Sequence, residues 1–257
     1  MFISPSIEIV KKGVCVSIIT ASIIFAAFAC YIGFQALKNL QLRNLNASLA
    51  SRDFETVEKL AEMPLSKKIL GAYTCDLYQL RARYLDKDRS KFEHMLRHML
   101  DTAYKDPEDK KNFLEQYFHT FLLKGNAQYA SWILDSIRAL GEEALTRYTE
   151  QSYAVIVEHR TDLIEAMNAQ IDSKQYYGFS LGVILFMIAK QYEALQDTEN
   201  AVLYYENAKI CFHPKAIYVR QIEESVKRLG KPDKEPQTEH DGTCTGSLRN
   251  TTGIGEK

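Results

Sequence analysis

The segment QYEALQDTENAVLYYENAKICFHP, residues 191–214, decides the expected fold of this chain. Two stretches rich in apolar and helix-forming residues flank the polar sequence QDTEN, which is typical of a break between helices. In the second stretch, small residues alternate with an aromatic one at Ala201, Tyr205 and Ala208. Small residues let two helices approach closely, and aromatic rings fill the gap to a neighbouring pair. The segment therefore predicts a helical hairpin with a tight internal contact.

Similar short runs recur along the chain with a nearly constant period. Their corresponding positions are 36, 37, 36 and 35 residues apart: Val57, Glu93, Ala130, Ala166 and Ala201. Each later run is preceded by another helical run with its own apolar stripe, such as NFLEQYFHTFLL before Ala130. Helix pairs that recur in this way are typical of a helical-hairpin solenoid, because one hairpin cannot bury its apolar face alone.

The hairpin in residues 182–215 resembles a tetratricopeptide repeat (TPR). The match lies in a large apolar residue, a small one and an aromatic in the first helix, and in small, aromatic and small positions in the second: Ile188, Ala189, Tyr192, Ala201, Tyr205 and Ala208. Looser copies keep Phe121 with Ala130 in the third unit and Ala166 in the fourth. The resemblance covers about residues 41–215 and implies an all-α, TPR-like α-solenoid of about five hairpins. A non-repetitive helical bundle is the alternative.

A last helix and a polar tail follow the repeats. An apolar stripe predicts a C-terminal capping helix, with Tyr218, Ile222, Val226 and Leu229 on one face. Solenoids need such a cap with one polar face. The tail, residues 230–257, contains two Pro, several Gly and almost no apolar side chains. Such a composition cannot offset the entropy of the chain, so we expect the tail to be disordered.

The amino-terminal part contains a segment apolar enough for a membrane. Residues 13–37 carry no charged side chain over 25 positions and predict a transmembrane helix after a short flank, residues 1–12. Residues 27–29 (AFA) also match a signal-peptide cleavage site before Cys30, and lipoprotein-type cleavage at Cys30 is a further alternative. Apolar sequence continues beyond Cys30, which favours an uncleaved anchor.

The join between the anchor and the repeats lacks a helix breaker. No Pro or Gly lies between Phe34 and the polar residues 51–53, and the expected repeat domain, residues 38–229, follows the anchor directly. The sequence therefore predicts one continuous helix over about residues 13–50, because nothing in the join removes a backbone hydrogen bond. A flexible joint, frayed by the asparagines of this stretch, is the alternative.

Charges and thiols bear on the orientation of the chain in the membrane. Positive residues flank the anchor about equally, so the positive-inside rule does not decide: Lys11 and Lys12 before it, and Lys38, Arg43 and Arg52 after it. The five cysteines contain no CxxC pair, which speaks against a disulfide framework and for a reducing compartment. We therefore expect a single-pass membrane protein with its soluble domain on the cytoplasmic side.

Composition and motifs exclude several classes of function. The 32 Lys and Arg against 33 Asp and Glu give no basic excess, which speaks against nucleic-acid binding. No Gly-rich phosphate loop or nucleophile elbow is present, so we expect neither catalysis nor a cofactor. His94 and His98 share one helix face, and with His119 they make a helical metalloprotein an alternative. The Glu of HExxH is missing, so no metal is expected.

A TPR-like fold implies a partner-binding groove. By alignment within the last repeat, Phe186, Lys190 and Glu193 face the concave surface that binds peptides or partner helices in this family. The expected function is therefore a membrane-anchored interaction scaffold that recruits or tethers a protein partner without catalysis. An extracytoplasmic accessory or chaperone-like subunit for exported proteins is the alternative.

Overall fold

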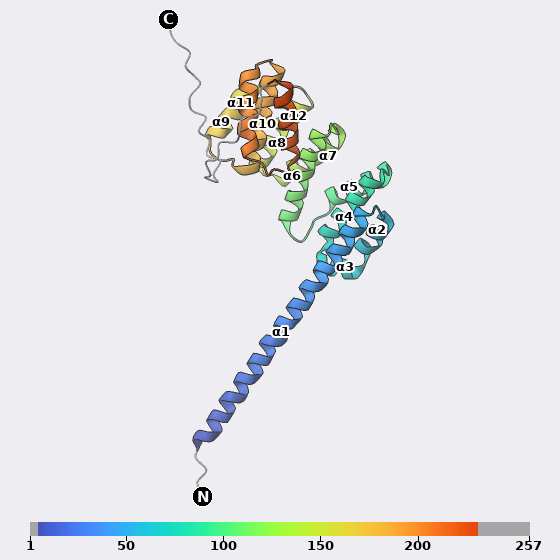
Figure 1. The fold of residues 1–257 in the computed structure, drawn as a ribbon, viewed down its shortest axis with the longest axis vertical. Helices are drawn as coiled ribbons and strands as arrows, with labels where there is room; N and C mark the ends of the chain where they lie inside the picture. The colour runs from blue at the N-terminus through green and yellow to red at the C-terminus, as the bar shows by residue number, and fades with distance from the viewer. Residues whose placement is uncertain (1–4, 231–257) are drawn as a thin grey trace. The chain divides into compact units, whose positions relative to one another are not determined.

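A computed structural model describes residues 5–230, with side chains from Thr20 onward (Figure 1). The chain divides into two compact units, unit 1 over residues 1–107 and unit 2 over residues 108–257. Every regular element in the described residues is an α-helix, which confirms the all-α expectation for this part of the chain. The tail predicted after Gly230 lies outside the described residues.

The described part of unit 1 contains five helices: α1 (Pro5–Ala50), α2 (Phe54–Glu62), α3 (Pro64–Leu70), α4 (Ala72–Asp86) and α5 (Arg89–Asp101). The described part of unit 2 follows with seven more: α6 (Pro107–Leu123), α7 (Ala127–Leu140), α8 (Glu143–Ile156), α9 (Ile164–Asp172), α10 (Gly178–Ala194), α11 (Thr198–Ile210) and α12 (Ile217–Arg228). Every run that the sequence period identifies lies in one of these helices, namely α2, α5, α7, α9 and α11.

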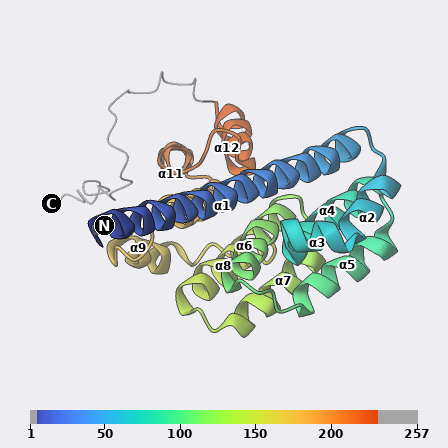
Figure 2. The ribbon, with the colours of Figure 1, turned by 90° about the horizontal axis from the view of Figure 1, so that it is seen from below.

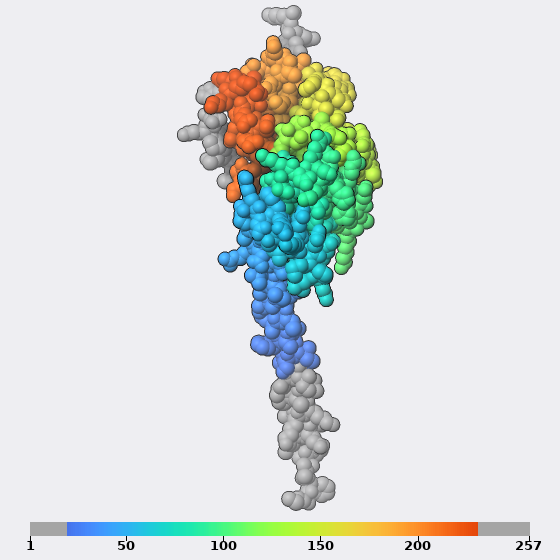
Figure 3. Space-filling model, turned by 90° about the vertical axis from the view of Figure 1, so that its right-hand side faces the viewer, coloured from blue at the N-terminus to red at the C-terminus, as the bar shows by residue number. Residues whose placement is uncertain are grey.

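Helix α1 runs without interruption from an apolar segment into the fold of unit 1. The prediction of one continuous helix over residues 13–50 is confirmed, and the helix starts earlier, at Pro5. Its part from Thr20 to Ala50 is long and apolar enough to cross a membrane, by length and composition. The side chains of residues 20–34 are exposed, with Phe25 73% accessible, and Figure 3 shows this part of α1 extending bare from unit 1.

The last turns of α1 supply the core of unit 1. Leu45 is fully buried, and Leu42 and Leu49 pack on the same face because they lie three and four residues away. They join an apolar cluster from α2, α3 and α4: Val57, Ala61, Ile69, Leu70, Cys75, Tyr78 and Ala82. Figure 2 shows the chain turning at the end of α1 and returning as α2. Tyr78 Oη donates a 2.7 Å hydrogen bond to Asn46 Oδ1, which ties α4 to α1.

One turn geometry recurs between paired helices in both units. A residue with positive φ directly precedes an Asp or Asn at four places: Arg52–Asp53, Lys87–Asp88, Gly125–Asn126 and Gln196–Asp197. At three of them the Asp or Asn backbone N–H donates to the carbonyl five residues earlier, at 2.9 Å, which closes the preceding helix. The three Asp carboxylates then accept the N–H of the third residue of the next helix and cap it. A short polar connection therefore ends one helix and starts the next.

In each helix pair, the residue at which the second helix begins determines which of its side chains is buried in the core. These second helices are α2, α5, α7, α9 and α11. The fourth residue of each is buried: Val57, Phe92, Ala130, Met167 and Ala201. The packing role predicted for Ala166 is therefore wrong, because α9 begins at Ile164 and turns Met167 inward while Ala166 stays exposed. Glu93 is also one position away from the core residue, which is Phe92.

Helix α10 is central to unit 2, where it packs against α8, α9 and α11. Its residues 181–189 are all buried. Four of the small and aliphatic residues predicted to pack between α10 and α11 are fully buried: Ile188, Ala189, Ala201 and Ala208. A β-carbon on Gly182 would lie 2.8 Å from Cys211 Cβ, so α10 approaches the end of α11 very closely.

Aromatic rings fill the rest of the core of unit 2. The ring centroids of Phe186 on α10 and Tyr205 on α11 are 5.5 Å apart, and Tyr218 on α12 lies 4.9 Å from Phe186. Two further predicted packing residues are Phe121, which is buried, and Tyr192, which is half-buried. Helix α12 is present where the final apolar stripe predicts a helix, and it closes this cluster with the fully buried Tyr218.

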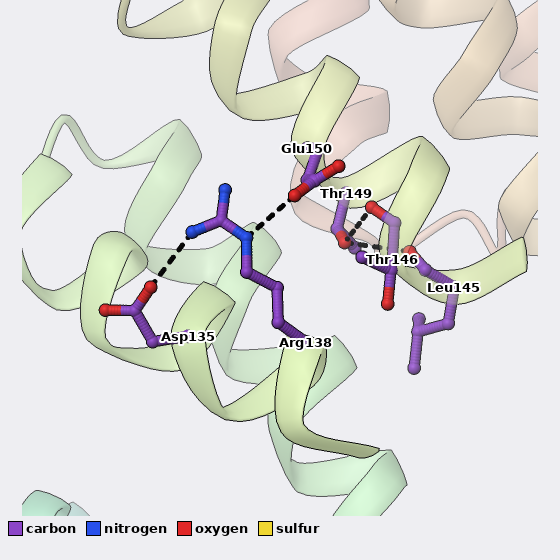
Figure 4. A network of polar contacts seen from close by, with 6 residues as sticks. All are labelled: Asp135, Arg138, Leu145, Thr146, Thr149 and Glu150. Carbon is purple, nitrogen blue, oxygen red and sulfur yellow. Dashed lines mark hydrogen bonds and ion pairs between the residues drawn. The ribbon is translucent and has the colours of Figure 1, made fainter. Parts of the chain in front are cut away.

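A polar layer joins α7 to α8 (Figure 4). Arg138 Nε donates to Glu150 Oε1 at 2.7 Å, and Arg138 Nη1 donates to Asp135 Oδ1 at 2.9 Å. The hydroxyl of Thr149 is buried and donates to the Leu145 carbonyl of its own helix at 2.8 Å. Only the pair with Glu150 joins the two helices, because Asp135 lies on α7 itself; since Arg138 is about half exposed, both ion pairs contribute little to stability.

Candidate partner-binding groove

A groove of about 510 Å³ opens on the surface of unit 2. The ends of α6, α8 and α10 form its walls, together with the loop before α9 and one residue of α12. Apolar side chains, called here the apolar wall, line it at Leu122, Leu123, Val155 and Ile156, and polar ones, called the polar rim, line it at His159, Arg160, Lys190, Glu193 and Gln221. An apolar wall with a polar rim is the usual composition of a site that binds part of another protein chain.

Glu193 is the centre of the polar rim. Its carboxylate accepts hydrogen bonds from Tyr205 Oη at 2.5 Å, from Lys190 Nζ at 3.2 Å and from the Arg228 guanidinium. Burial alone would raise the pKa of Glu193, but the hydrogen bond from Tyr205 and the two positive charges outweigh it and lower this pKa. The carboxylate is therefore ionised at neutral pH, and it neutralises one of the two cations beside it.

The loop between α8 and α9 forms one edge of the groove and is tied to α10. The Leu163 N–H donates to Gln191 Oε1 at 2.9 Å, and Gln191 Nε2 donates to the Met187 carbonyl at 3.3 Å. Within the loop, the Arg160 guanidinium makes two hydrogen bonds to the Asp162 carboxylate, at 2.9 and 2.6 Å. The loop therefore has a defined path along the groove, and its arginine is already neutralised.

Two of the three residues predicted to face a groove do line this one, namely Lys190 and Glu193. The prediction for Phe186 is wrong, because its side chain is fully buried. The alignment places an open concave surface at this position of the first helix. Here Tyr218 of α12 packs onto that surface and, with Tyr205, encloses the Phe186 ring.

A buried polar cluster lies in the core of unit 2. His119 Nδ1 and Tyr218 Oη are 2.7 Å apart, and Tyr148 Oη donates a hydrogen bond to Glu115. Burial lowers the pKa of His119 to about 3, so its imidazole is neutral. Burial, and then the charge of Glu115, raises the pKa of Tyr148 well above its ordinary value. The two hydrogen bonds join α6 to α12 and to α8.

A second hollow, of about 440 Å³, lies in unit 1 and is lined in part by His94, His98 and Asp76. Asp76 Oδ2 accepts a 3.0 Å hydrogen bond from Tyr104 Oη and lies 3.7 Å from His98 Nε2. His119, the third histidine of the metal alternative, is enclosed beside Tyr218 in unit 2. Within the residues that the structure describes, no three His, Cys, Asp or Glu side chains gather closely enough to hold a metal ion.

Sequence reasoning missed the partners of the groove charges. Arg228 lies on the last helix, 35 residues from Glu193, and Tyr205 was assigned only a packing role. One signal was present in the sequence, because Gln191 interrupts the apolar face of α10 and is fully buried. A buried amide needs hydrogen-bond partners, so its position indicates that a loop must reach α10 there.

Hydrogen bonds hold the carboxylate at the rim of the groove in one position. Glu193 Oε2 accepts from Tyr205 and Lys190, and Glu193 Oε1 accepts from Arg228. The apolar wall offers contact area to a bound segment, and the polar rim offers hydrogen-bonding groups that would orient it. No family model, no curated protein and no solved structure matches the chain.

Proposed function

We propose that this protein is a membrane-anchored, TPR-like scaffold whose groove in unit 2 binds a segment of a protein partner. The observation that carries the proposal is the double role of α1. Its exposed apolar part suits a bilayer, and its last turns bury Leu45 in the core of unit 1. A single helix with both roles would hold the folded part of the chain at the membrane surface.

Two structural features support the TPR-like part of the proposal. The same turn recurs between paired helices, and the fourth residue of each second helix is buried. Helix α10 also packs against both α11, its partner in the hairpin, and α8, the first helix of the preceding pair. Contacts between successive pairs are those of a repeat array, so we propose a solenoid of five hairpins with α12 as its cap.

The groove indicates the chemistry of the partner. The apolar wall requires aliphatic or aromatic side chains on the bound segment. Lys190 at the rim and Arg228 beside it share the single carboxylate of Glu193, so this group of three side chains keeps one positive charge in excess. The segment would therefore carry an acidic group beside its apolar side chains, and binding would need neither catalysis nor a cofactor.

Site-specific crosslinking tests this proposal. A photoreactive amino acid at Gln221, which lines the groove, is introduced into the full chain in its membrane. We expect one defined protein adduct, and we expect the Lys190→Glu variant to reduce its yield because the group of three side chains then loses its positive excess.

The matched control uses Lys174, an exposed lysine in the turn before α10 and outside the groove. A photoreactive residue at this position should not give the adduct, and Lys174→Glu should not change the yield at Gln221. The proposal fails if both positions give the same adducts, or if Lys190→Glu leaves the yield unchanged.

We also propose that residues 38–230 lie on the cytoplasmic side of the membrane. A Lys174→Cys variant places a thiol at an exposed position of unit 2. A membrane-impermeant maleimide should label this thiol only after the cells are permeabilised. Labelling in intact cells would instead support the extracytoplasmic alternative.

A further inference from the structure

Helix α3 has no counterpart in the other helix pairs of the described chain. It is inserted between α2 and α4, begins at Pro64, and ends at Gly71 with a positive φ. Its inner face is buried in unit 1 at residues 66, 69 and 70. Its outer face and the residue before it remain exposed, with Leu65 48% and Met63 42% accessible.

The hairpin geometry places α3 close to the end of the apolar part of α1. The chain turns after Ala50, and α2 then runs back along α1 for nine residues, or about 13 Å. The end of α2 is therefore level with about Leu42 of α1, which packs in the same cluster as Ile69 of α3. Leu42 is only about 7 Å along the helix from Leu37, where the uncharged stretch ends.

Figure 1 agrees with this estimate, because α3 lies at the end of unit 1 from which α1 extends. The headgroup layer on each side of a bilayer is about 5–8 Å thick. If the uncharged part of α1 occupies the hydrocarbon core, the exposed face of α3 therefore reaches the headgroups.

The charges around α3 suit such a position. Lys67 and Lys68 are exposed on the helix, and Lys38 follows the uncharged stretch of α1. Neither Lys38 nor Lys68 has an ion-pair partner among the described residues, and the acidic residue nearest in sequence to Lys67 and Lys68 is Glu62 at the end of α2. Exposed apolar side chains beside lysines are the usual composition of a helix that lies on an anionic membrane surface.

We propose that α3 is a membrane-surface helix. Met63 and Leu65 enter the headgroup layer of the bilayer that α1 spans, and Lys67 and Lys68 bind the phosphates of anionic lipids. Unit 1 then has two attachments to the membrane, which fix its tilt as well as its distance. This inference rests on the membrane span of the proposed function, so its test must separate the two.

Fluorescence quenching by brominated lipids provides that test. The full chain is reconstituted in nanodiscs of phosphatidylcholine and phosphatidylglycerol whose acyl chains are brominated near the headgroup end in one sample, which reports on residue 65 and residue 85, and near the bilayer middle in another, which reports on residue 23. Trp132, which is the one tryptophan of the chain, is replaced by Phe to remove its signal. Single tryptophans are then introduced at exposed positions, as Leu65→Trp on α3, Leu85→Trp at the far end of α4 and Ile23→Trp on α1.

We expect quenching of Leu65→Trp and Ile23→Trp but not of Leu85→Trp. The last is the matched control, because Leu85 is 49% accessible and lies at the other end of α4, about 20 Å from α3. Adding Lys67→Glu and Lys68→Glu should remove most of the quenching at Leu65, and pure phosphatidylcholine nanodiscs should do the same.

Each other outcome has a definite meaning. Quenching at Ile23 without quenching at Leu65 overturns the membrane-surface helix and leaves the anchor intact. Equal quenching at Leu65 and Leu85 also overturns it, because unit 1 would then contact lipid without the orientation that α3 provides. Absence of quenching at Ile23 removes the membrane span itself, and the inference falls with it.

Discussion

The core of unit 1 is closed by a helix that continues out of the fold, whereas the core of unit 2 is closed by its own last helix. In unit 1, the buried Leu45 belongs to α1, which extends into the apolar segment. In unit 2, the buried Tyr218 belongs to α12. The cluster around Leu45 is largely aliphatic, whereas Tyr218 contacts several rings and the imidazole of His119.

This difference means that the stability of each unit depends on a different structural feature. Unit 1 depends on α1, so a change at the buried positions of its last turns acts on the core of unit 1. Unit 2 depends on a buried polar cluster, so it responds to pH. The two can be followed separately, because Trp132 lies in unit 2 and its fluorescence does not report directly on unit 1.

Truncating the closing residue of unit 2 should have the largest effect. Tyr218→Ala removes a fully buried ring that contacts Phe186 and His119, and it should cost about 3–5 kcal/mol. The measurement is urea unfolding of the full chain in detergent, followed by Trp132 fluorescence. A midpoint equal to that of wild type would show that α12 is not part of this core.

Truncating the corresponding residue of unit 1 should affect the other unit. Leu45→Ala empties a fully buried site and should cost about 2–5 kcal/mol. Circular dichroism should show early loss of helix while Trp132 fluorescence keeps its wild-type midpoint. The control is Leu40→Ala, one turn away on α1 and 53% accessible, which should cost less than about 0.5 kcal/mol. A parallel shift of both signals would mean that the units unfold together.

Acid should destabilise unit 2 through His119. Its pKa is about 3 when folded and about 6.5 when exposed, so below pH 6.5 the unfolded chain binds a proton that the folded chain does not. The contribution of neutral His119 to the free energy of unfolding is therefore fully present above pH 6.5. Below that pH it falls by about 1.4 kcal/mol per pH unit, so the loss is about 2 kcal/mol at pH 5.

Urea unfolding followed by Trp132 fluorescence at pH 7.5 and pH 5 measures this loss. The His119→Phe variant keeps a ring in the site and should flatten the difference between the two pH values. The same pH dependence in wild type and variant would contradict the assignment. The carboxylate of Glu193 does not interfere, because its pKa is lowered from 4.5 and it titrates below this window.

The smallest effect tests the corrected register of the second helices. Ala201→Leu overpacks a fully buried site between α10 and α11 and should cost about 1–3 kcal/mol. Ala166→Leu adds the same atoms at the exposed position of α9 and should leave the melting temperature close to wild type. Equal destabilisation by both substitutions would mean that Ala166 corresponds to Ala201, as the sequence period predicts. It would contradict the correspondence of Met167 with Ala201 that the starts of the helices give.

The helices and their order were predictable from local signals. Asp53, Asp88 and Asp197 are capping residues that stand out in the sequence, and the runs after them have helical spacing. The repeat pattern does not predict α3, because this helix has only seven residues and no side-chain cap, although proline suits a first helical turn. The register of α9 was missed because its N-cap, Leu163, makes no side-chain capping bond and has no polar signature.

The groove was predictable only in part, because its residues meet through the tertiary fold. Lys190 and Glu193 lie one turn apart on α10, so a helical pattern was enough to pair them. The burial of Phe186 depends on where α12 packs, and an apolar stripe does not specify that contact. The bond between Arg228 and Glu193 depends on the same packing, so sequence reasoning about α10 alone could not include it.

The continuity of α1 sets an angle as well as a length. In an α-helix, each residue added or removed between Leu37 and Leu42 turns unit 1 by about 100° around the helix axis and shifts it by about 1.5 Å. Only insertions or deletions close to a full turn of about 3.6 residues return unit 1 to its original direction around the helix axis. The number of residues in this short stretch therefore sets the azimuthal direction in which unit 1 points around the axis of α1.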